Sequence, residues 1–315
     1  SALREIVGVR LRRSVPKGDF LFPSDIGDAA SGARNFDFTR PWGLPVRFHD
    51  WRALASQSNP DFLEFHLSYS DLGIDFGLAL DDHMPFGLVV HSPDLFSEDM
   101  VLDLAAENQE LRMRSIRELQ RVIDLTRDML PRFDQDVEPL IVASLGGSSL
   151  EPLVGEYEKE FMYERVNDSL SRLDTQDVIL IAQTLPPYPW YLGGQRYCHL
   201  FVDPEETARF AQTSGIPLCL DVAHTKLATN WLRTSFSRAT EILLPQTVHL
   251  HLVDAGGVDD EGLQILEGEI DWEILASAIS RLAPNSSFIP EIWQGHVDDG
   301  AGFWTALDRL ERLLQ

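Results

Sequence analysis

The sequence contains little cysteine, few basic residues and no long apolar run. Its two cysteines, Cys198 and Cys219, cannot form a disulfide framework, which is typical of a reducing cytoplasm. Lysine and arginine number 26 against 50 acidic residues, giving a formal net charge of −24. Such a surface repels phosphate backbones, so we expect no nucleic-acid partner. No apolar stretch approaches the roughly 20 residues that cross a bilayer, and no signal peptide is visible, so we expect a cytoplasmic protein without a membrane partner.

From about residue 44 the chain alternates between short apolar runs and segments with helical periodicity. The predicted strands span residues 44–49, 62–68, 87–91, 139–145, 177–183, 217–222, 247–253 and 287–292. Helix-like segments lie between most of them, for example at 103–130, after Pro204, after Trp272 and at 303–314. About eight strand–helix repeats indicate an α/β fold of the (β/α)8 TIM barrel type. An open doubly wound sheet is the alternative, but no Gly-x-Gly-x-x-Gly follows the first strand.

The first 40 residues do not share this rhythm. Residues 7–19 are basic and end in the turn-forming sequence Pro-Lys-Gly-Asp, and residues 28–35 have the composition of a linker. We therefore divide the chain into an N-terminal segment, residues 1–40, and one barrel domain, residues 41–315.

Titratable side chains gather where the predicted strands end. The plainest case is the apolar run 216–220, which is followed by Asp221 and, three residues later, by His224. In a barrel the carboxyl ends of all strands converge on one mouth, where imidazoles and carboxylates can share a divalent cation. The pattern therefore predicts a metal site at this mouth. The strand-end residues are Glu64, His66, His91, Gln183, Asp221, His224, His249, His251, Asp254 and Glu291.

Each of these residues also has a purely structural interpretation. Asp221 could cap the helix that follows it. Glu64 could pair with a basic residue in the barrel floor, and His91 could hydrogen-bond a loop. His249 and His251 alternate with leucines and therefore face the same side of one strand, so one of them could belong to a deeper layer.

Several motifs resemble the xylose-isomerase-like barrel superfamily of sugar-phosphate isomerases and epimerases, which also contains the endonuclease IV class of DNA-repair enzymes. They are His91-Ser92-Pro93, Asp221-Val222-Ala223-His224, residues 249–254 (HLHLVD), residues 267–272 (EGEIDW) and Ile289-Pro290-Glu291. More narrowly, residues 185–195 and 289–296 resemble the barrel domain fused behind certain sialic acid synthase homologues, and part of residues 1–40 resembles the end of the antifreeze-like domain of sialic acid synthases. The resemblance implies a sialic acid synthase-like domain in the same or a longer polypeptide, and a role in sialic-acid-like sugar biosynthesis.

Sugar epimerases of this superfamily hold one divalent metal through Glu, Asp, His and Glu, and the resemblance places these ligands at Gln183, Asp221, His251 and Glu291. It also matches His224 to a histidine that contacts the substrate beside the metal. The amide of Gln183 brings no charge and cannot take a proton, so two-base epimerisation through this residue is excluded. Leu266 is a smaller departure, because the family more often has glycine there.

Three outcomes remain for the chemistry. The protein is a one-base isomerase using Glu291, an enzyme that recruits another acid such as Glu64, or a non-catalytic sugar-binding or assembly domain of a multidomain synthase. In an enzyme, the predicted catalytic residues are Glu291, His224 and Glu64, and the metal stabilises an enediolate. Mn²⁺, Co²⁺, Mg²⁺ and Zn²⁺ all suit these nitrogen and oxygen donors. The net charge and the missing glutamate argue against a DNA-repair endonuclease.

The predicted ligand is a small-molecule sugar or sugar phosphate. Trp190, in an aromatic loop after the fifth strand, and Trp293, after the last, offer faces that pack on sugar C–H groups. Arg196 is a candidate partner for a substrate carboxylate or phosphate, and His91 and His249 complete the predicted substrate contacts. Alternatively, the aromatic loop is buried against a neighbouring subunit of a homo-oligomer.

Overall fold

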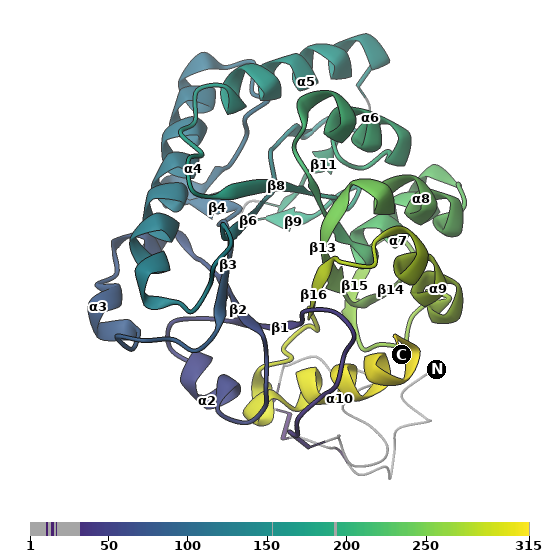
Figure 1. Cartoon of the computed structure of the whole chain (residues 1–315). Coiled ribbons are helices and arrows are strands. Elements are labelled where there is room, and N and C mark those ends of the chain that lie inside the picture. Colours follow the sequence, from purple (N-terminus) through teal and green to yellow (C-terminus); the bar gives the residue numbers. More distant parts are fainter. Residues whose placement is uncertain are drawn as a thin grey trace.

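The computed structural model describes residues 11, 14–15, 17, 32–152, 154–191 and 194–314. Eight parallel strands form a ring at its centre (Figure 1). In their order around the ring they are β1 (Gly43–Val46), β2 (Phe62–His66), β3 (Gly87–His91), β6 (Leu140–Ala143), β8 (Ile179–Gln183), β12 (Leu218–Asp221), β13 (Thr247–Leu252) and β16 (Ser287–Pro290). The ring closes beside β1, where the Phe288 N–H donates to the carbonyl of Pro41 at 3.1 Å. The predicted TIM barrel is therefore confirmed, and the open sheet is excluded.

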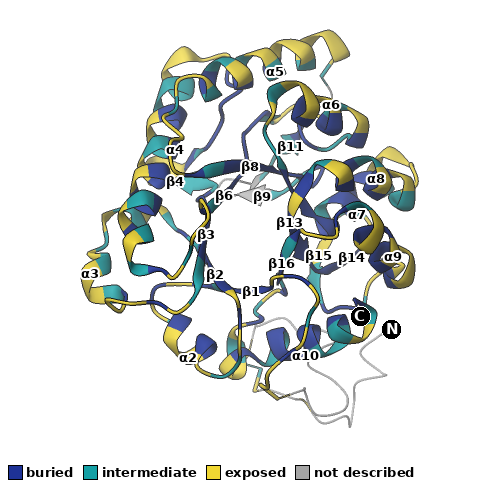
Figure 2. Cartoon of the chain, viewed as in Figure 1, coloured by how far each residue is buried: buried dark blue, intermediate teal, exposed yellow. Residues whose placement is uncertain are grey.

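Helices surround the strands, with their exposed faces turned outward (Figure 2). They are α2 (Trp51–Ala55), α3 (Phe76–Ala79), α4 (Gln109–Met129), α5 (Glu156–Leu170), α6 (Pro204–Ser214), α7 (Val222–Leu232), α8 (Phe236–Leu243), α9 (Trp272–Leu282) and α10 (Val297–Leu313). Four short antiparallel pairs lie in connections that follow barrel strands: β4 (Leu95–Phe96) with β5 (Met100–Val101), β7 (Ser148–Ser149) with β11 (Tyr197–Cys198), β9 (Trp190–Tyr191) with β10 (Gly194–Gln195), and β14 (Asp254–Gly256) with β15 (Asp260–Leu263). None of the helices in the described ranges is long and apolar enough to cross a bilayer.

Alternation along the strands sorts their side chains into two cores. Outward-facing residues such as Leu63 of β2 and Leu250 of β13 belong to the large cluster that includes the helices. The barrel interior holds a second cluster of Phe62, Val89, Val142, Ile181, Cys219 and Ile289. Two residues further along the chain from each of these six, the side chain is polar, namely Glu64, His91, Ser144, Gln183, Asp221 and Glu291. The two-residue alternation that places apolar side chains in the barrel interior thus also places a ring of polar side chains nearer the ends of the strands.

Two predicted boundaries shift because an aspartate makes a turn. Helix α4 begins at Gln109 instead of residue 103, since the carboxylate of Asp103 accepts the N–H of Ala105 at 2.9 Å and holds the preceding residues in a turn. Strand β1 ends at Val46 instead of residue 49, since the carboxylate of Asp50 accepts the backbone N–H of Arg47 at 2.7 Å. Side-chain hydrogen bonds of this kind compete with regular backbone structure.

The connection between β13 and α9 is built around the buried carboxylate of Asp254. It accepts three backbone N–H groups at 2.9–3.1 Å and the indole N–H of Trp272 at 2.7 Å. Gly268 is required beside it, because a Cβ there would collide with an Asp254 oxygen. These four donors satisfy the carboxylate, so Asp254 has a structural role.

Leu266, in the same connection, has a backbone φ of +71° and is 57% exposed. The left-handed conformation costs a non-glycine residue roughly 1–2 kcal/mol, of which the larger unfolded-state entropy of glycine offsets about 0.5–1 kcal/mol. We therefore expect Leu266→Gly to raise the free energy of unfolding by up to about 1 kcal/mol, while Leu266→Ala keeps the backbone penalty and gains nothing. Thermal denaturation checks this, and a Leu266→Gly protein that melts no higher than Leu266→Ala would contradict it.

Residues 32–40 pack against the end of the barrel where the strands begin. The ring of Phe38 meets that of Phe288 edge-on, with centroids 4.9 Å apart, and Arg34 pairs with Asp308 at 3.0 Å and with Glu311 at 2.6 Å on α10. Apart from residues 11, 14, 15 and 17, the preceding segment lies outside the described residues, and with it most of the predicted antifreeze-like segment. The assignment of residues 1–40 to a separate N-terminal segment stays a prediction.

Candidate active site

The carboxyl ends of the strands bring most of the predicted site residues to one mouth. His66, His91, Gln183 and Asp221 are the last residues of their strands, and Glu291 directly follows β16. The parallel register pairs His66 with His91 and Asp221 with His251. The rings of His66 and His91 stack with centroids 4.8 Å apart, and that of His251 lies 5.7 Å from His91. Residues far apart in sequence therefore form one compact polar cluster.

The two carboxylate oxygens of Asp221 have different partners. Its Oδ1 accepts the backbone N–H of His224 at 2.9 Å and so caps α7. Its Oδ2 lies 3.4 Å from the amide nitrogen of Gln183, which donates to it, and 3.9 Å from Nδ1 of His251. One oxygen thus starts the helix while the other remains available to a ligand in the mouth.

His224 faces the same mouth from the first turn of α7. Its Nδ1 lies 2.8 Å from the carbonyl oxygen of Thr184 and 3.3 Å from Asp221, and its Nε2 lies 3.5 Å from the Glu261 carboxylate. Burial by itself lowers the pKa of His224, but the carboxylates of Asp221 and Glu261 raise it to about 10. His224 therefore offers a positively charged hydrogen-bond donor at neutral pH.

Gln183 lies at the centre of the cluster. Its amide oxygen is 3.1 Å from Nε2 of His91, and its amide nitrogen is 3.2 Å from Nδ1 of His251 and 3.4 Å from Asp221. In this orientation the NH₂ group, and not the amide oxygen, is directed at Asp221 and His251. The amide has to turn over by about 180° to present its oxygen as a ligand.

His251 is held between two carboxylates. Its Nδ1 lies 2.7 Å from Glu291 Oε2 and its Nε2 lies 3.0 Å from Glu64 Oε1, with no exposed surface on the imidazole. Burial by itself lowers the pKa of His251, but the neighbouring Cys219, Glu291 and Glu64 together raise it well above its ordinary value. Without another cation, the proton on this ring supplies the positive charge that the carboxylates require.

Glu64 and His249 form a deeper layer, and both are fully buried. The second oxygen of Glu64 lies 2.7 Å from Nε2 of His249, whose Nδ1 lies 2.7 Å from the hydroxyl of Ser287. Burial by itself raises the pKa of Glu64, yet His251 and His249 hold it well below its ordinary range. A direct catalytic or substrate contact by Glu64 or His249 has no support in this arrangement, because neither side chain is exposed.

Part of the donor set is close enough for a divalent ion: ligand atoms of His91, His251 and Glu291 all lie within 4.8 Å of one another, while Asp221 is close to His251 but is not part of this group. Metal–ligand bonds of about 2.0–2.2 Å put two ligands of one ion no more than about 4.4 Å apart. Nδ1 of His251 lies 2.7 Å from a Glu291 oxygen and 3.9 Å from an Asp221 oxygen. Beside them, Oε1 of Glu64 lies 2.9 Å from Nε2 of His66 and 3.0 Å from Nε2 of His251. These three atoms are buried, and none of them forms an aligned hydrogen bond. A cation at His251 Nδ1 would replace the ring proton and leave Nε2 oriented by Glu64, the usual outer partner of a metal-bound imidazole.

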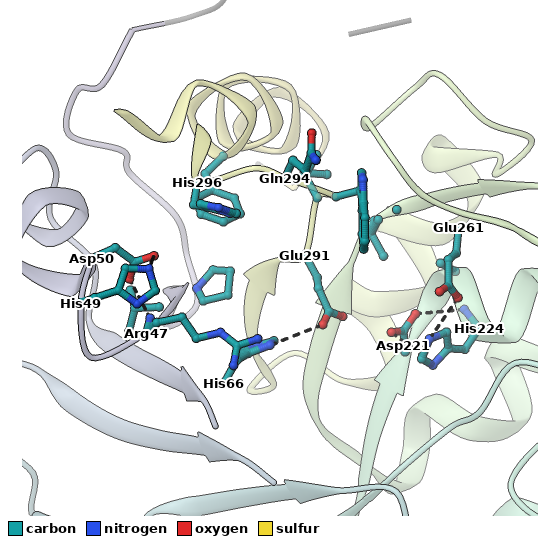
Figure 3. Close-up of a pocket in the computed structure, with 18 residues that line it drawn as sticks. Arg47, His49, Asp50, His66, Asp221, His224, Glu261, Glu291, Gln294 and His296 are labelled. Carbon is teal, nitrogen blue, oxygen red and sulfur yellow. Dashed lines mark hydrogen bonds and ion pairs between the residues drawn. The ribbon is translucent and has the colours of Figure 1, made fainter. Parts of the chain in front are cut away.

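A cavity of about 400 Å³ opens above this cluster (Figure 3). Its apolar wall includes Trp293, which is 61% exposed, and Phe303. Its polar lining consists of Arg47, His49, Asp50, His66, Asp221, His224, Glu261, Glu291, Gln294 and His296. This volume lies within the range of about 300–1,000 Å³ that is usual for small-molecule sites.

Not every predicted contact reaches this cavity. The guanidinium of Arg196 donates to the hydroxyl and the carbonyl oxygen of Ser148, each at 3.2 Å, and it does not line the cavity. The side chain of Trp190 lies outside the described residues. Sequence reasoning gave no role to Arg47 or Glu261, because each lies in a connection whose path over the mouth no local pattern specifies. His66 was noted as a strand end, and the period-two alternation from Phe62 was the signal that could have assigned it to the site.

A family model described as "Xylose isomerase-like TIM barrel" matches residues 53–313. The chain belongs to this family. The motifs that carried the resemblance therefore identified the family correctly. A search of curated protein sequences finds no match.

Solved structures similar to the family member described here include several sugar epimerases. A D-tagatose 3-epimerase-like protein is 17% identical, with 87% of this chain and 98% of that chain covered and a TM-score of 0.60. An L-ribulose 3-epimerase is 14% identical, with coverages of 86% and 94% and a TM-score of 0.58. A D-psicose 3-epimerase from Clostridium cellulolyticum H10, solved with D-tagatose, is 14% identical, with coverages of 87% and 99% and a TM-score of 0.56. At these identities the similarity establishes the shared fold.

Proposed function

We propose that this protein is a divalent-metal-dependent sugar isomerase or epimerase in which Glu291 transfers the proton. The observation that carries the proposal is the position of Glu291. Its carboxylate is 29% exposed, lines the cavity, and lies beside the Asp221–His251 pair. The sugar epimerases among the similar structures support the substrate class.

Asp221, His251 and Glu291 are the residues that would hold the ion, with Gln183 as a neutral fourth ligand after its amide turns over. When bound, the metal supplies a positive charge that polarises a sugar carbonyl and favours loss of a proton from the neighbouring carbon. The chain's own contribution is the arrangement of these side chains in a largely buried pocket, where charges act more strongly than in water.

Proton transfer through a single carboxylate favours isomerisation. Glu291 can remove a proton from one carbon and return it to its neighbour on the same face of the substrate. Inversion at one carbon requires a second acid or base on the opposite face, and Gln183 cannot supply it. Glu64 is fully buried and engaged with His249 and His251, so its recruitment is the less favoured alternative. We therefore favour a one-base aldose–ketose isomerase.

The remaining lining residues would position the sugar. His224, protonated by its contacts with Asp221 and Glu261, can donate a hydrogen bond to a hydroxyl or carbonyl oxygen. Trp293 offers an exposed aromatic face at the opening.

Gln183 favours a second candidate, a non-catalytic sugar-binding or assembly domain of a multidomain synthase. A neutral amide in a four-ligand site lowers the charge available to a metal. The link to sialic-acid-like sugar biosynthesis belongs to both candidates, and it rests on the resemblance of part of residues 1–40 and of residues 185–195 and 289–296.

Metal binding by Gln183→Glu distinguishes the two candidates. We expect the variant to bind Mn²⁺ or Co²⁺ at least about tenfold more tightly, since a charged carboxylate replaces an amide. Without metal the same variant should melt below the wild type, because a carboxylate then faces Asp221 where an NH₂ group now donates at 3.4 Å. Calorimetric titration of the metal and melting curves with and without it provide the measurements.

Gln294→Glu is the matched control, because it adds the same charge to the cavity lining away from the proposed ligands. It should not reproduce the metal-dependent stabilisation. Activity is assayed with D-tagatose, D-psicose and L-ribulose. Metal bound by wild type together with turnover supports the enzyme. Sugar binding without metal or turnover in either protein supports the binding domain, and a Gln183→Glu protein with unchanged metal affinity would refute the proposed ligand set.

A further inference from the structure

Arg47 and His49 lie with Asp50 on one wall of the cavity, and Asp221 and Glu261 lie with His224 on the opposite wall (Figure 3). His49 and Arg47 come from the connection after β1, and His296 comes from the start of α10. Asp221 and Glu261 are both close to His224.

Arg47 is the one arginine or lysine among the residues that line this cavity. Figure 3 shows its side chain extending from the end of β1 into the cavity, in the direction of His66. Its guanidinium makes no hydrogen bond or ion pair within the described ranges, even though Asp50 is three residues away. The Asp50 carboxylate instead accepts the backbone N–H of Arg47 at 2.7 Å.

Twelve of the nineteen arginines in the described ranges pair with a carboxylate, and Arg47 is one of the seven that do not. Acidic residues outnumber basic ones 50 to 26. Arg52, a few residues further along, pairs with Asp81 at 2.7 Å, and Arg309 pairs with Glu267 at 2.9 Å. The fork of five N–H donors on Arg47 is thus left free to meet a ligand in the cavity.

We propose that Arg47 binds an anionic group of the sugar, either a carboxylate or a phosphate ester. This rests on the proposed function, because it assumes that the cavity holds the sugar whose reacting carbons lie at Asp221 and Glu291. A planar guanidinium suits both kinds of oxyanion. Arg196, the residue expected from the sequence to make this contact, is instead bonded to Ser148 outside the cavity.

The test compares three ketoses that share their first five carbons and differ at C6: D-fructose, D-fructose 6-phosphate and D-fructuronate. Binding is measured by isothermal titration calorimetry with Mn²⁺ present and absent, and turnover is assayed separately. We expect the wild type to bind at least one anionic probe about tenfold to a hundredfold more tightly than D-fructose. The two anionic probes tell a phosphate site from a carboxylate site.

In Arg47→Gln this preference should disappear while the affinity for D-fructose stays the same, and Arg47→Lys should retain part of it. Arg117→Gln is the matched control, since it removes the same charge from the exposed face of α4. Three outcomes would overturn the inference: D-fructose bound as tightly as both anions, a preference that survives in Arg47→Gln, or no binding of any probe. If sugars are epimerised or isomerised and Arg47→Gln changes nothing, the proposed function is supported and the role of Arg47 is refuted. If binding of an anionic probe depends on Arg47 but no turnover occurs, the role of Arg47 is supported and the proposed catalysis is not.

Discussion

Replacing Glu291 by glutamine is expected to reduce the rate of proton exchange from the substrate by about a thousandfold, within the range of roughly 10²–10⁴ that one general base contributes. The amide keeps the size of the side chain and can still ligate a metal through its oxygen, but it cannot take a proton. The measurement is the incorporation of deuterium from D₂O into D-tagatose or D-psicose, followed by NMR with Mn²⁺ in excess. Exchange reports proton removal even if the identity of the product is unknown.

Glu261→Gln controls for the loss of a carboxylate from the same cavity. Glu261 lies 3.5 Å from Nε2 of His224, it is half-exposed, and it is not among the proposed metal ligands. We expect this variant to keep most of the exchange rate. Metal content is measured for both proteins, so that a weakened ion site is not mistaken for a lost base. Equal exchange rates in Glu291→Gln and the wild type, with equal metal, would show that the proton is taken elsewhere.

The barrel and the ring of polar side chains at its mouth could be predicted from the sequence because both follow from the two-residue alternation along the strands. The alternation that puts Phe62 inside the barrel also puts Glu64 and His66 inside, and the same rule applies from Cys219 to Asp221. Parallel strands then bring these positions together without any information about loops. This is why residues as far apart in sequence as Glu64 and Glu291 could be assigned to one site.

The depth of each side chain within the barrel and the path of each loop over the mouth could not be predicted in the same way. Periodicity shows that Glu64 faces inward but not that it lies beneath the cavity, where His249 and His251 engage both of its oxygens. Arg47 was missed because the carboxylate of Asp50 ends β1 early, so that a residue expected within a strand lies in the cavity wall. Both outcomes depend on side-chain contacts that the pattern of apolar residues does not encode.

The second large effect is expected at Glu64, in the stability of the fold. Its carboxylate lies 2.7 Å from His249, 3.0 Å from His251 and 2.9 Å from His66, with no exposed surface. Removing one partner of a buried charged cluster typically costs about 3–5 kcal/mol, because the remaining groups lose their counter-charge. We expect Glu64→Leu to lower the free energy of unfolding by this amount, as measured by urea denaturation of the metal-free protein.

Glu64→Gln separates the charge of this carboxylate from its shape. It keeps an oxygen that can accept from His249, so it should lose less stability than Glu64→Leu, yet it no longer orients His251 through a charged contact. Loss of such an outer partner typically weakens metal binding about 10- to 100-fold. Glu164→Leu, at an exposed position of α5, controls for the apolar substitution and should leave stability nearly unchanged. A Glu64→Leu protein as stable as this control would mean that the histidines are neutral and satisfied without the carboxylate, and that Glu64 does not hold the proposed ligand His251 in place.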